Sequence, residues 1–289
     1  MGAADFAVME QHLEGPREPL ASGKLVLSRL KPGRSVIGAP APSLKLVVEG
    51  EENYEVDGRN LHVRPGQFLY LDAGATCTGT NRSETTGICL ILPPSRVPGD
   101  AAHAEGHDPV LGRALVLSTA TSAMGRALHD YALRIARDPS LGSALAGELI
   151  ASAAEAVAEP LGESRAAIEA LKAAKASTRR ALFQRLERAR GFLHDHSERT
   201  VSLAETASLA GLSQFHLARY FKLAFGLSPI AYHRGLRLAR AAELLAAGGR
   251  SVAEVAESTG YSDQVSLSHA FRKHYGLPPQ HWATARRAS

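Results

Sequence analysis

The sequence predicts an α+β chain of two domains, a small β-barrel with helices followed by an all-α domain of two helix-turn-helix units joined by a long helix. Three observations predict this fold class. The hydrophobic pattern changes from strand-like to helix-like near residue 110, one motif occurs twice about fifty residues apart, and the C-terminal part is basic. We expect the first domain at 1–160, a linker at 161–181 and the second domain at 182–289.

The first half of the chain has the composition of short strands. Segments rich in Val, Leu, Ile and Tyr are separated by Gly, Pro, Asn and Asp, and we expect strands at 24–30, 44–49, 54–57, 60–64, 67–71 and 86–92. The clearest hairpin has Asp57-Gly58 at its tip, a pair that favours a type I′ turn. Several short strands with such turns, reaching to about residue 95, predict a small sandwich or barrel.

From about residue 110 the pattern predicts helices. Segments 122–137 and 141–158 are rich in Ala and Leu, with a break at Asp138-Pro139 and an end at Pro160. These helices could form a subunit interface or could cover the sheet, and the sequence does not separate the two. Residues 161–181 are polar and alanine-rich, and they are interpreted as a partly helical linker.

The C-terminal part contains an internal repeat. Ser202-Leu-Ala-Glu205 and Ser251-Val-Ala-Glu254 both have the capping-box pattern, so each starts a helix. Each helix lasts about two turns and stops at a glycine, Gly211 or Gly260, because glycine tolerates the left-handed C′ conformation. The repeat therefore begins two equivalent short helices.

A second helix follows in each copy. Ser213 can cap the first, Ser262 or Asp263 the other, and the helices run to Gly226 and Gly276. Helix, short turn, helix is the helix-turn-helix pattern, here predicted at about 202–226 and 251–276. A helix over 229–247 would separate them by roughly 27 Å, close to the roughly 34 Å repeat of one face of B-DNA.

The charge of the chain is unevenly distributed. Residues 182–289 hold 14 Lys and Arg against 8 Asp and Glu, a net +6, whereas residues 1–181 hold the remaining 19 and 21, a net −2. A basic module on a near-neutral body suggests a polyanionic partner for one end only. No apolar run approaches the roughly 18 residues of a membrane span, no signal peptide is evident, and Cys77 and Cys89 form no disulfide framework. We expect a cytoplasmic protein without a membrane partner.

Residues 183–282 resemble the DNA-binding domain of the bacterial AraC/XylS transcription regulators. The matching stretches are 213–222, 226–229, 237–241, 255–256, 260–264 and 271–276. The resemblance implies a seven-helix module whose third and sixth helices bind double-stranded DNA, and it implies activation through contact with RNA polymerase.

Helix geometry indicates which side chains face DNA. With Leu217 and Phe221 turned inward, and Leu267 and Phe271 likewise, the opposite face is free to enter a groove. The expected base-contacting residues are Gln214, Phe215, Ala218, Arg219, Gln264, Val265, Ser266 and His269. The expected phosphate-contacting residues are Ser213, Lys222, Ser262, Arg272 and Lys273.

The second unit departs from the family pattern. Val265, Leu267 and His269 stand where the family commonly has Ser, Phe and Arg. Leu267 still suits a core, but His269 replaces a residue that makes strong base or phosphate contacts. We therefore expect the second unit to bind more weakly and to tolerate more sequences.

Residues 49–67 resemble part of the small cupin barrel that often precedes this DNA-binding domain. Metal-binding cupins supply clustered His and Glu ligands, whereas His62 stands alone in its strand and His103 and His107 lack an evident third ligand. We expect no metal, no cofactor and no enzyme. The first domain is then a sensor for a small-molecule effector of unknown identity and a dimerisation domain.

The first functional hypothesis is an effector-responsive, sequence-specific activator that forms a homodimer. Two alternatives remain open. One is a cupin-like enzyme tethered to DNA, and the other is a regulator controlled by a protein partner instead of a small ligand.

Overall fold

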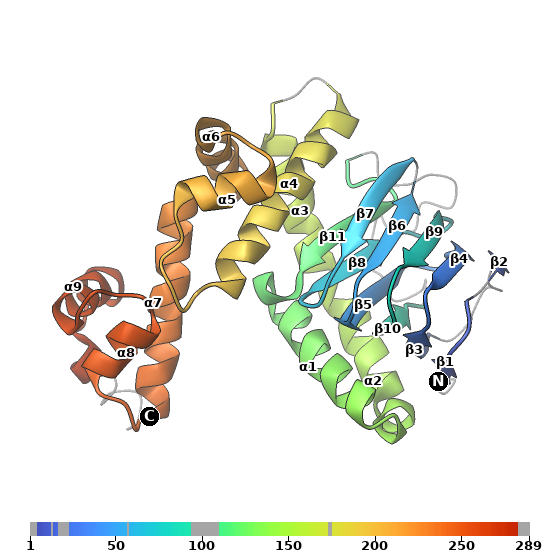
Figure 1. The fold of residues 1–289 in the computed structure, drawn as a ribbon, viewed down its shortest axis with the longest axis horizontal. Helices are drawn as coiled ribbons and strands as arrows, with labels where there is room; N and C mark the ends of the chain where they lie inside the picture. Colours follow the sequence, from blue (N-terminus) through green and yellow to red (C-terminus); the bar gives the residue numbers. More distant parts are fainter. Residues whose placement is uncertain are drawn as a thin grey trace. The chain divides into compact units, whose positions relative to one another are not determined.

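The computed structural model describes residues 5–12, 14–16, 23–56, 58–93, 110–172 and 175–282. The chain divides into two units, Met1–Glu187 and Arg188–Ser289 (Figure 1). The division falls inside a helix and six residues beyond the predicted end of the linker. Each unit is considered by itself below.

The first unit is built on two β-sheets whose inner faces share one core. The first sheet has the strand order β1-β3-β10-β5-β8-β11 and the second has the order β2-β4-β9-β6-β7. Neighbouring strands are antiparallel except for the pairs β1–β3 and β2–β4. The strands of the first sheet are β1 (Asp5–Met9), β3 (Lys24–Leu30), β5 (Ser43–Glu49), β8 (Gln67–Leu71), β10 (Thr85–Ile91) and β11 (Ala114–Ser118). Those of the second are β2 (Glu14–Pro16), β4 (Gly33–Gly38), β6 (Glu52–Val56), β7 (Arg59–Val63) and β9 (Thr76–Asn81).

The predicted hairpin is confirmed. Strands β6 and β7 pair from Glu52 opposite Val63 to Val56 opposite Arg59, and Gly58 at the tip has φ +69°. Alternate residues of both strands point inward, so that Tyr54 and Leu61 enter the core between the sheets. The period of two that predicted the strands is thus the period of burial.

Five strands, β1, β2, β4, β9 and β11, were not predicted, and for three of them the physical reason is evident. β4 is bounded by glycines, and β9 is mostly Thr, Gly and Asn, so neither has the apolar composition of a typical strand. β11 lies where the sequence pattern indicated helix, and this expectation was wrong. All five residues of β11 are buried, because the strand pairs with β8 inside the unit.

Two helices cover the outer face of the first sheet. α1 (Ala123–Arg137) contacts β5 and β10, and α2 (Ser140–Ala156) contacts β1 and β3 (Figure 1). Leu128, Ala132 and Ile135 of α1 are buried at helical spacing. The sequence left open whether these helices cover the sheet or form a subunit interface. The buried faces of α1 and α2 cover the sheet.

The predicted linker is instead largely helix with its own buried side. α3 (Ala158–Ala170) buries Leu161 and Ile168, seven residues apart, and Leu171 follows at its end. The polar and alanine-rich composition of this segment concealed that apolar stripe. α4 (Ala176–Asp195) follows, with five residues between the end of α3 and its own first residue.

Helices α2 and α3 form one apolar stretch, Ser140–Ala170, of 31 residues with a mean hydropathy of 1.3 in its most apolar window. By length and composition this stretch could cross a membrane, which corrects the expectation that no such segment exists. Within the fold 39% of that window is buried, and α2 contacts two strands of the sheet. Burial against a sheet is a sufficient reason for its apolar composition.

The second unit consists of the end of α4 and five further helices. These are α5 (Leu203–Ala210), α6 (Gln214–Phe225), α7 (Pro229–Ala247), α8 (Val252–Ser258) and α9 (Gln264–Tyr275). The predicted repeat is confirmed, since α5–α6 and α8–α9 are two helix-turn-helix units joined by the 19-residue α7. Leu217, Phe221, Leu267 and Phe271 are all completely buried.

Candidate nucleic-acid interface

The second helix of each unit, α6 or α9, is fixed at both ends by its own sequence. Ser213 accepts a hydrogen bond from the amide of His216 at 3.2 Å, and Asp263 accepts one from the amide of Ser266 at 2.7 Å. Asp263, not Ser262, is therefore the cap of α9. Each helix ends at a left-handed glycine, and these caps set where each helix starts and stops.

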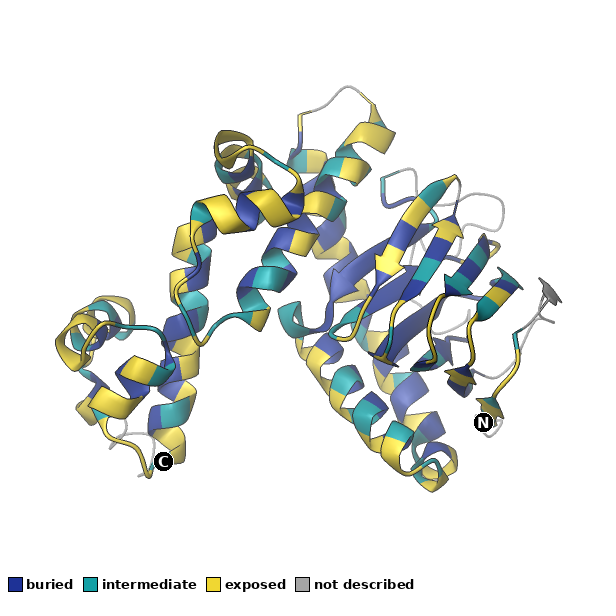
Figure 2. Ribbon diagram, viewed as in Figure 1, coloured by how far each residue is buried: buried dark blue, intermediate teal, exposed yellow. Residues whose placement is uncertain are grey.

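Aromatic packing fixes the rotation of both helices. Phe221 lies 4.7 Å from Phe225 and 5.5 Å from Tyr232, measured between ring centroids. In the second helix-turn-helix unit Phe271 makes the equivalent contacts with Tyr275 at 4.5 Å and Trp282 at 5.9 Å. With these faces buried, the opposite faces of α6 and α9 are turned to solvent (Figure 2).

On α6 the predicted base-contacting residues lie on this open face. Gln214, Phe215 and Arg219 are exposed, and Ala218 is half-buried beside them. The ring of Phe215 is 70% exposed, which is unusual for a phenylalanine that is not held by a partner. The face thus presents an amide, an apolar ring and a guanidinium, which are groups suited to adenine, the thymine methyl and guanine.

On α9 the corresponding face carries His269 at the position equivalent to Arg219. Gln264, Val265, Ser266 and His269 are exposed, and Val265 is 71% exposed. The hydroxyl of Ser266 already contacts Asp263 at 3.2 Å and Ser262 at 3.1 Å, so it belongs to the helix cap as well as to the open face. The second face therefore offers fewer strong hydrogen-bonding groups than the first.

The predicted phosphate-contacting residues are exposed at the edges of the same faces. Lys222, Arg272 and Lys273 form no ion pair with an acidic side chain in the described part of the chain. Ser213 and Ser262 are exposed as well, with hydroxyls engaged at the helix N-termini. Backbone N–H groups at these N-termini also favour an anion.

One residue of the open face escaped the sequence analysis. His216 is exposed on α6, its ring stacks on Tyr220 with the centroids 5.8 Å apart, and its Nδ1 lies 3.1 Å from the hydroxyl of Ser213. Its counterpart in the other copy, fifty residues on, is the predicted Ser266. Applying the same offset to both copies would have identified His216.

A buried arginine joins the long helix to the second helix-turn-helix unit. Arg237 of α7 is 8% exposed and donates to the carbonyl oxygens of Thr259 at 2.7 Å and Gly260 at 2.5 Å. Its guanidinium also lies 4.2 Å from the centroid of the Tyr261 ring. The hydroxyl of Thr200, just before α5, donates to the same Gly260 carbonyl at 3.0 Å. The turn between α8 and α9 is therefore held both by α7 and by the segment that leads into α5.

A buried histidine in this domain predicts a pH-dependent stability. His233 is 2% exposed, and its Nε2 must donate to the carbonyl of His196 at 3.1 Å. Burial lowers the pKa of His233, and the positive charges of Arg237 and Arg199 act in the same direction. The unfolded chain then binds this proton at a higher pH than the folded one does.

We expect the free energy of unfolding to fall as the pH drops below about 6.5, because only the unfolded histidine is readily protonated there. His233→Gln keeps an N–H donor and removes the titration, so it should flatten this part of the profile. Urea unfolding at about pH 5.5 and pH 7.5, followed by the fluorescence of the single tryptophan, measures the difference. Identical pH profiles for both proteins would contradict the assignment.

Comparison with known proteins agrees with this geometry. A family model for a helix-turn-helix domain matches residues 206–285. The probable transcriptional regulator LumQ of Photobacterium leiognathi is 35% identical over 88 residues, which cover 30% of this chain and 36% of that protein. A putative AraC-like transcription regulator of Streptomyces lividans is 36% identical over 87 residues, covering 30% of this chain and 29% of the relative.

A third relative and a solved domain match a similar share of the chain. The activator RhaS of Escherichia fergusonii is 35% identical over 105 residues, 36% of this chain and 38% of that protein. The DNA-binding domain of AdpA, solved with a target DNA, is 27% identical, with 36% of this chain and 93% of that domain covered and a TM-score of 0.35. The chain thus spans between 29% and 38% of the length of these curated relatives. The repeat, the caps and the family match together show a helix-turn-helix domain in the C-terminal unit, similar in sequence to part of AraC-like transcription regulators.

Proposed function

We propose that this protein is a transcription regulator that binds double-stranded DNA sequence-specifically through α6 and α9. The observation that carries the proposal is the pair of capped, exposed helices that occupy equivalent positions in two consecutive helix-turn-helix units. The curated relatives are themselves named as transcriptional regulators.

The dimensions of the domain support two contacts on one duplex. The 19 residues of α7 give a helix about 28 Å long, close to the roughly 34 Å between successive major grooves on one face of B-DNA. We propose that α6 and α9 enter adjacent major grooves. In this arrangement the residues predicted from the sequence read bases, and Lys222, Arg272 and Lys273 hold phosphates.

The experiment that tests this function is binding-site selection with the full chain, followed by gel-shift titration and footprinting of the selected site. We expect protection of two patches about one helical turn apart on one face of the duplex. We also expect the selected site to be preferred over random DNA at every salt concentration, since base contacts persist when phosphate contacts are screened. Binding without any sequence preference would contradict the proposal.

For the β unit we propose the role of a small-molecule sensor. Its two sheets enclose a cavity, and a ligand that favours one of two arrangements of the chain would change which DNA sites are occupied. Activation through RNA polymerase, dimerisation through this unit and a cytoplasmic location belong to the same proposal by family resemblance.

Neither alternative hypothesis is favoured by a specific observation. The described residues contain no group of three His, Cys, Asp or Glu side chains that could hold a metal ion, and His103 and His107 lie outside the described residues. His62 forms a hydrogen bond with Asn53 at 2.8 Å and an ion-pair contact with Glu51 at 3.2 Å, as a surface side chain does.

A further inference from the structure

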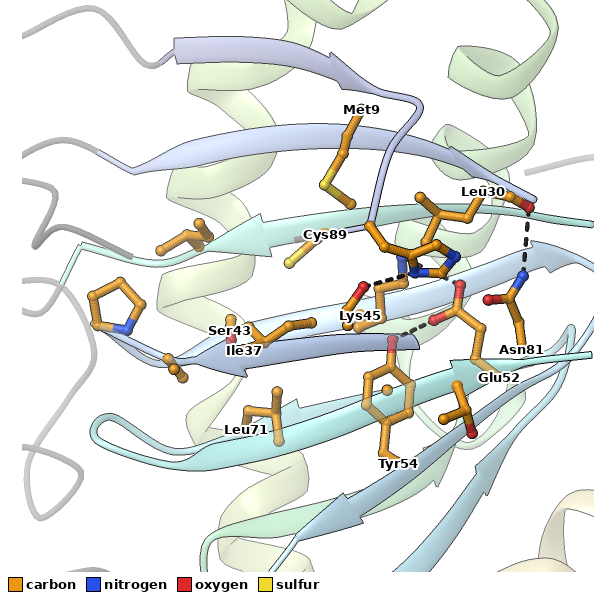
Figure 3. Close-up of a pocket in the computed structure, with 18 residues that line it drawn as sticks. Met9, Leu30, Ile37, Ser43, Lys45, Glu52, Tyr54, Leu71, Asn81 and Cys89 are labelled. Atoms are coloured by element: carbon orange, nitrogen blue, oxygen red, sulfur yellow. Dashed lines mark hydrogen bonds and ion pairs between the residues drawn. The ribbon is translucent and has the colours of Figure 1, made fainter. Parts of the chain in front are cut away.

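The cavity of the β unit lies between its two sheets and is mainly apolar. Met9, Leu30, Ile37, Leu71 and Ile91 contribute to its lining (Figure 3). These residues come from strands of both sheets, so the cavity is part of the sandwich and not of a surface loop. An apolar cavity with a few polar groups is the usual form of a small-molecule site.

Three polar side chains meet inside this apolar lining. Lys45, Glu52 and Tyr54 are 6%, 4% and 3% exposed, and they come from β5 and β6 on opposite sheets. The Lys45 ammonium lies 3.5 Å from Glu52 Oε1, and the Tyr54 hydroxyl donates to Glu52 Oε2, as Figure 3 shows. A buried ion pair seldom adds stability over an apolar pair of similar volume, so its presence in a cavity calls for a functional reason.

The hydrogen bonds of this cluster leave one donor available. Glu52 accepts from Tyr54 and, at 3.2 Å, from Thr85, in addition to its pairing with Lys45. Lys45 donates to Ser28 at 2.5 Å, and its third N–H has no partner among the described residues. Burial raises the pKa of Tyr54 well above its usual value, so the phenol keeps its proton and remains a donor to Glu52.

The charge of the cavity selects against ions. Lys45 and Glu52 are the only fixed charges among its described lining residues, and they neutralise each other. His12 is held by Ser35 and by the carbonyl of Lys31, both at 2.8 Å. A charged ligand would lose its hydration without meeting an unpaired counter-ion, which is strongly unfavourable. A neutral ligand loses much less.

We propose that this cavity binds a neutral, largely apolar small molecule with one hydroxyl or carbonyl oxygen, which accepts a hydrogen bond from Lys45. This assignment rests on the proposed sensor function of the β unit and names the chemical class of its ligand. The apolar lining holds the body of the molecule, and Glu52 holds Lys45 in place.

Cys89 allows occupancy to be measured without DNA. The chain has two cysteines, of which Cys77 is 1% exposed in the core and Cys89 lines the cavity at intermediate exposure. Alkylation of Cys89 in the full-length protein by iodoacetamide, followed by peptide mass spectrometry, reports whether the cavity is filled. The probes are cyclohexanone, cyclohexanol, cyclohexanecarboxylate and cyclohexylammonium, which share one ring and differ in their polar group.

We expect cyclohexanone or cyclohexanol, at a concentration ten times the probe's dissociation constant, to slow alkylation of Cys89 about tenfold. The same probe should raise the melting temperature of the protein. The two charged probes should do neither at the same concentrations. Equal or better protection by the carboxylate or the ammonium, or protection by none of the four probes, would overturn the proposal.

A double variant tests the role of the polar cluster. Lys45→Met with Glu52→Gln removes both charges together, so no unpaired charge stays buried and the sandwich should fold. With plain cyclohexane as a fifth probe, we expect the unmodified protein to prefer cyclohexanone to cyclohexane. In the double variant this preference should disappear while both probes still protect Cys89. Retention of the preference would show that Lys45 is not the donor.

DNA affinity measured on the same samples separates the two proposals. If the neutral probes protect Cys89 and DNA affinity is unchanged, the ligand class is supported and the sensor function for these ligands fails. If no probe protects Cys89 while selected DNA is still bound, the ligand assignment fails and the DNA-binding function stands.

Discussion

Gly260→Ala is expected to lower the free energy of unfolding of the C-terminal unit by about 2 to 5 kcal/mol and to weaken DNA binding with it. Gly260 has φ +69°, and a Cβ atom at this position would lie 2.7 Å from Cα of Arg199 and 2.8 Å from the amide nitrogen of Thr200. These are backbone atoms that cannot turn aside. The substitution would therefore push the turn between α8 and α9 away from the segment that leads into α5.

The matched control is Gly211→Ala. Gly211 occupies the equivalent turn of the first unit with φ +64°, but no atom lies within 4 Å of its added Cβ. It should lose only the left-handed strain, about 1 to 2 kcal/mol. Urea unfolding can be followed through Trp282, the single tryptophan, which packs on the core of the second unit. Equal destabilisation by the two variants would contradict the importance of the Arg199–Gly260 contact.

This contact illustrates what the sequence could and could not predict. The repeat gave both turns, the glycines that end their first helices and the caps that start their second, because these depend on neighbours within a few residues. The difference between Gly211 and Gly260 depends on Arg199 and Thr200, which lie about sixty residues from Gly260 along the chain. A local pattern contains no information about such an approach.

The two β-sheets show the same boundary between local and distant effects. Strands with alternating apolar residues, such as β6 and β7, were predicted, whereas β9 is a strand because its neighbours β4 and β6 pair with it. The cavity is more distant still. Lys45 and Glu52 have no pattern that joins them, and only the pairing of their strands within two facing sheets brings the charges to 3.5 Å.

The open faces of α6 and α9 were predictable in position but not in strength. Buried residues four apart fix the rotation of each helix, and this is local information. The structure adds the aromatic stack of His216 on Tyr220 and the use of Ser266 in the cap of α9. Both findings increase the difference in available hydrogen-bonding groups between the open faces of α6 and α9.

Arg219→Ala is expected to reduce affinity for the selected DNA site about 10- to 100-fold, the effect of losing one bidentate contact with guanine. Arg219 is exposed on α6, and its guanidinium carbon lies 5.7 Å from the centroid of the Tyr220 ring. Because the contact reads a base, the loss should be concentrated at one base pair, where the variant tolerates substitution. A pure phosphate contact would weaken all sequences equally.

The control is Arg240→Ala, which removes the same charge from the exposed surface of α7, where Arg240 pairs with Glu243 at 3.2 Å. It should change affinity little, since exposed ion pairs contribute little and α7 presents no recognition face.

The equivalent of Arg219 in the second helix-turn-helix unit is His269, so His269→Ala should reduce affinity less than Arg219→Ala does. Gel-shift titrations on the selected site and its single-base variants, at two salt concentrations, distinguish these cases. If His269→Ala matched or exceeded Arg219→Ala, α9 would contribute as much to sequence recognition as α6, and the inference from its weaker hydrogen-bonding groups would be wrong.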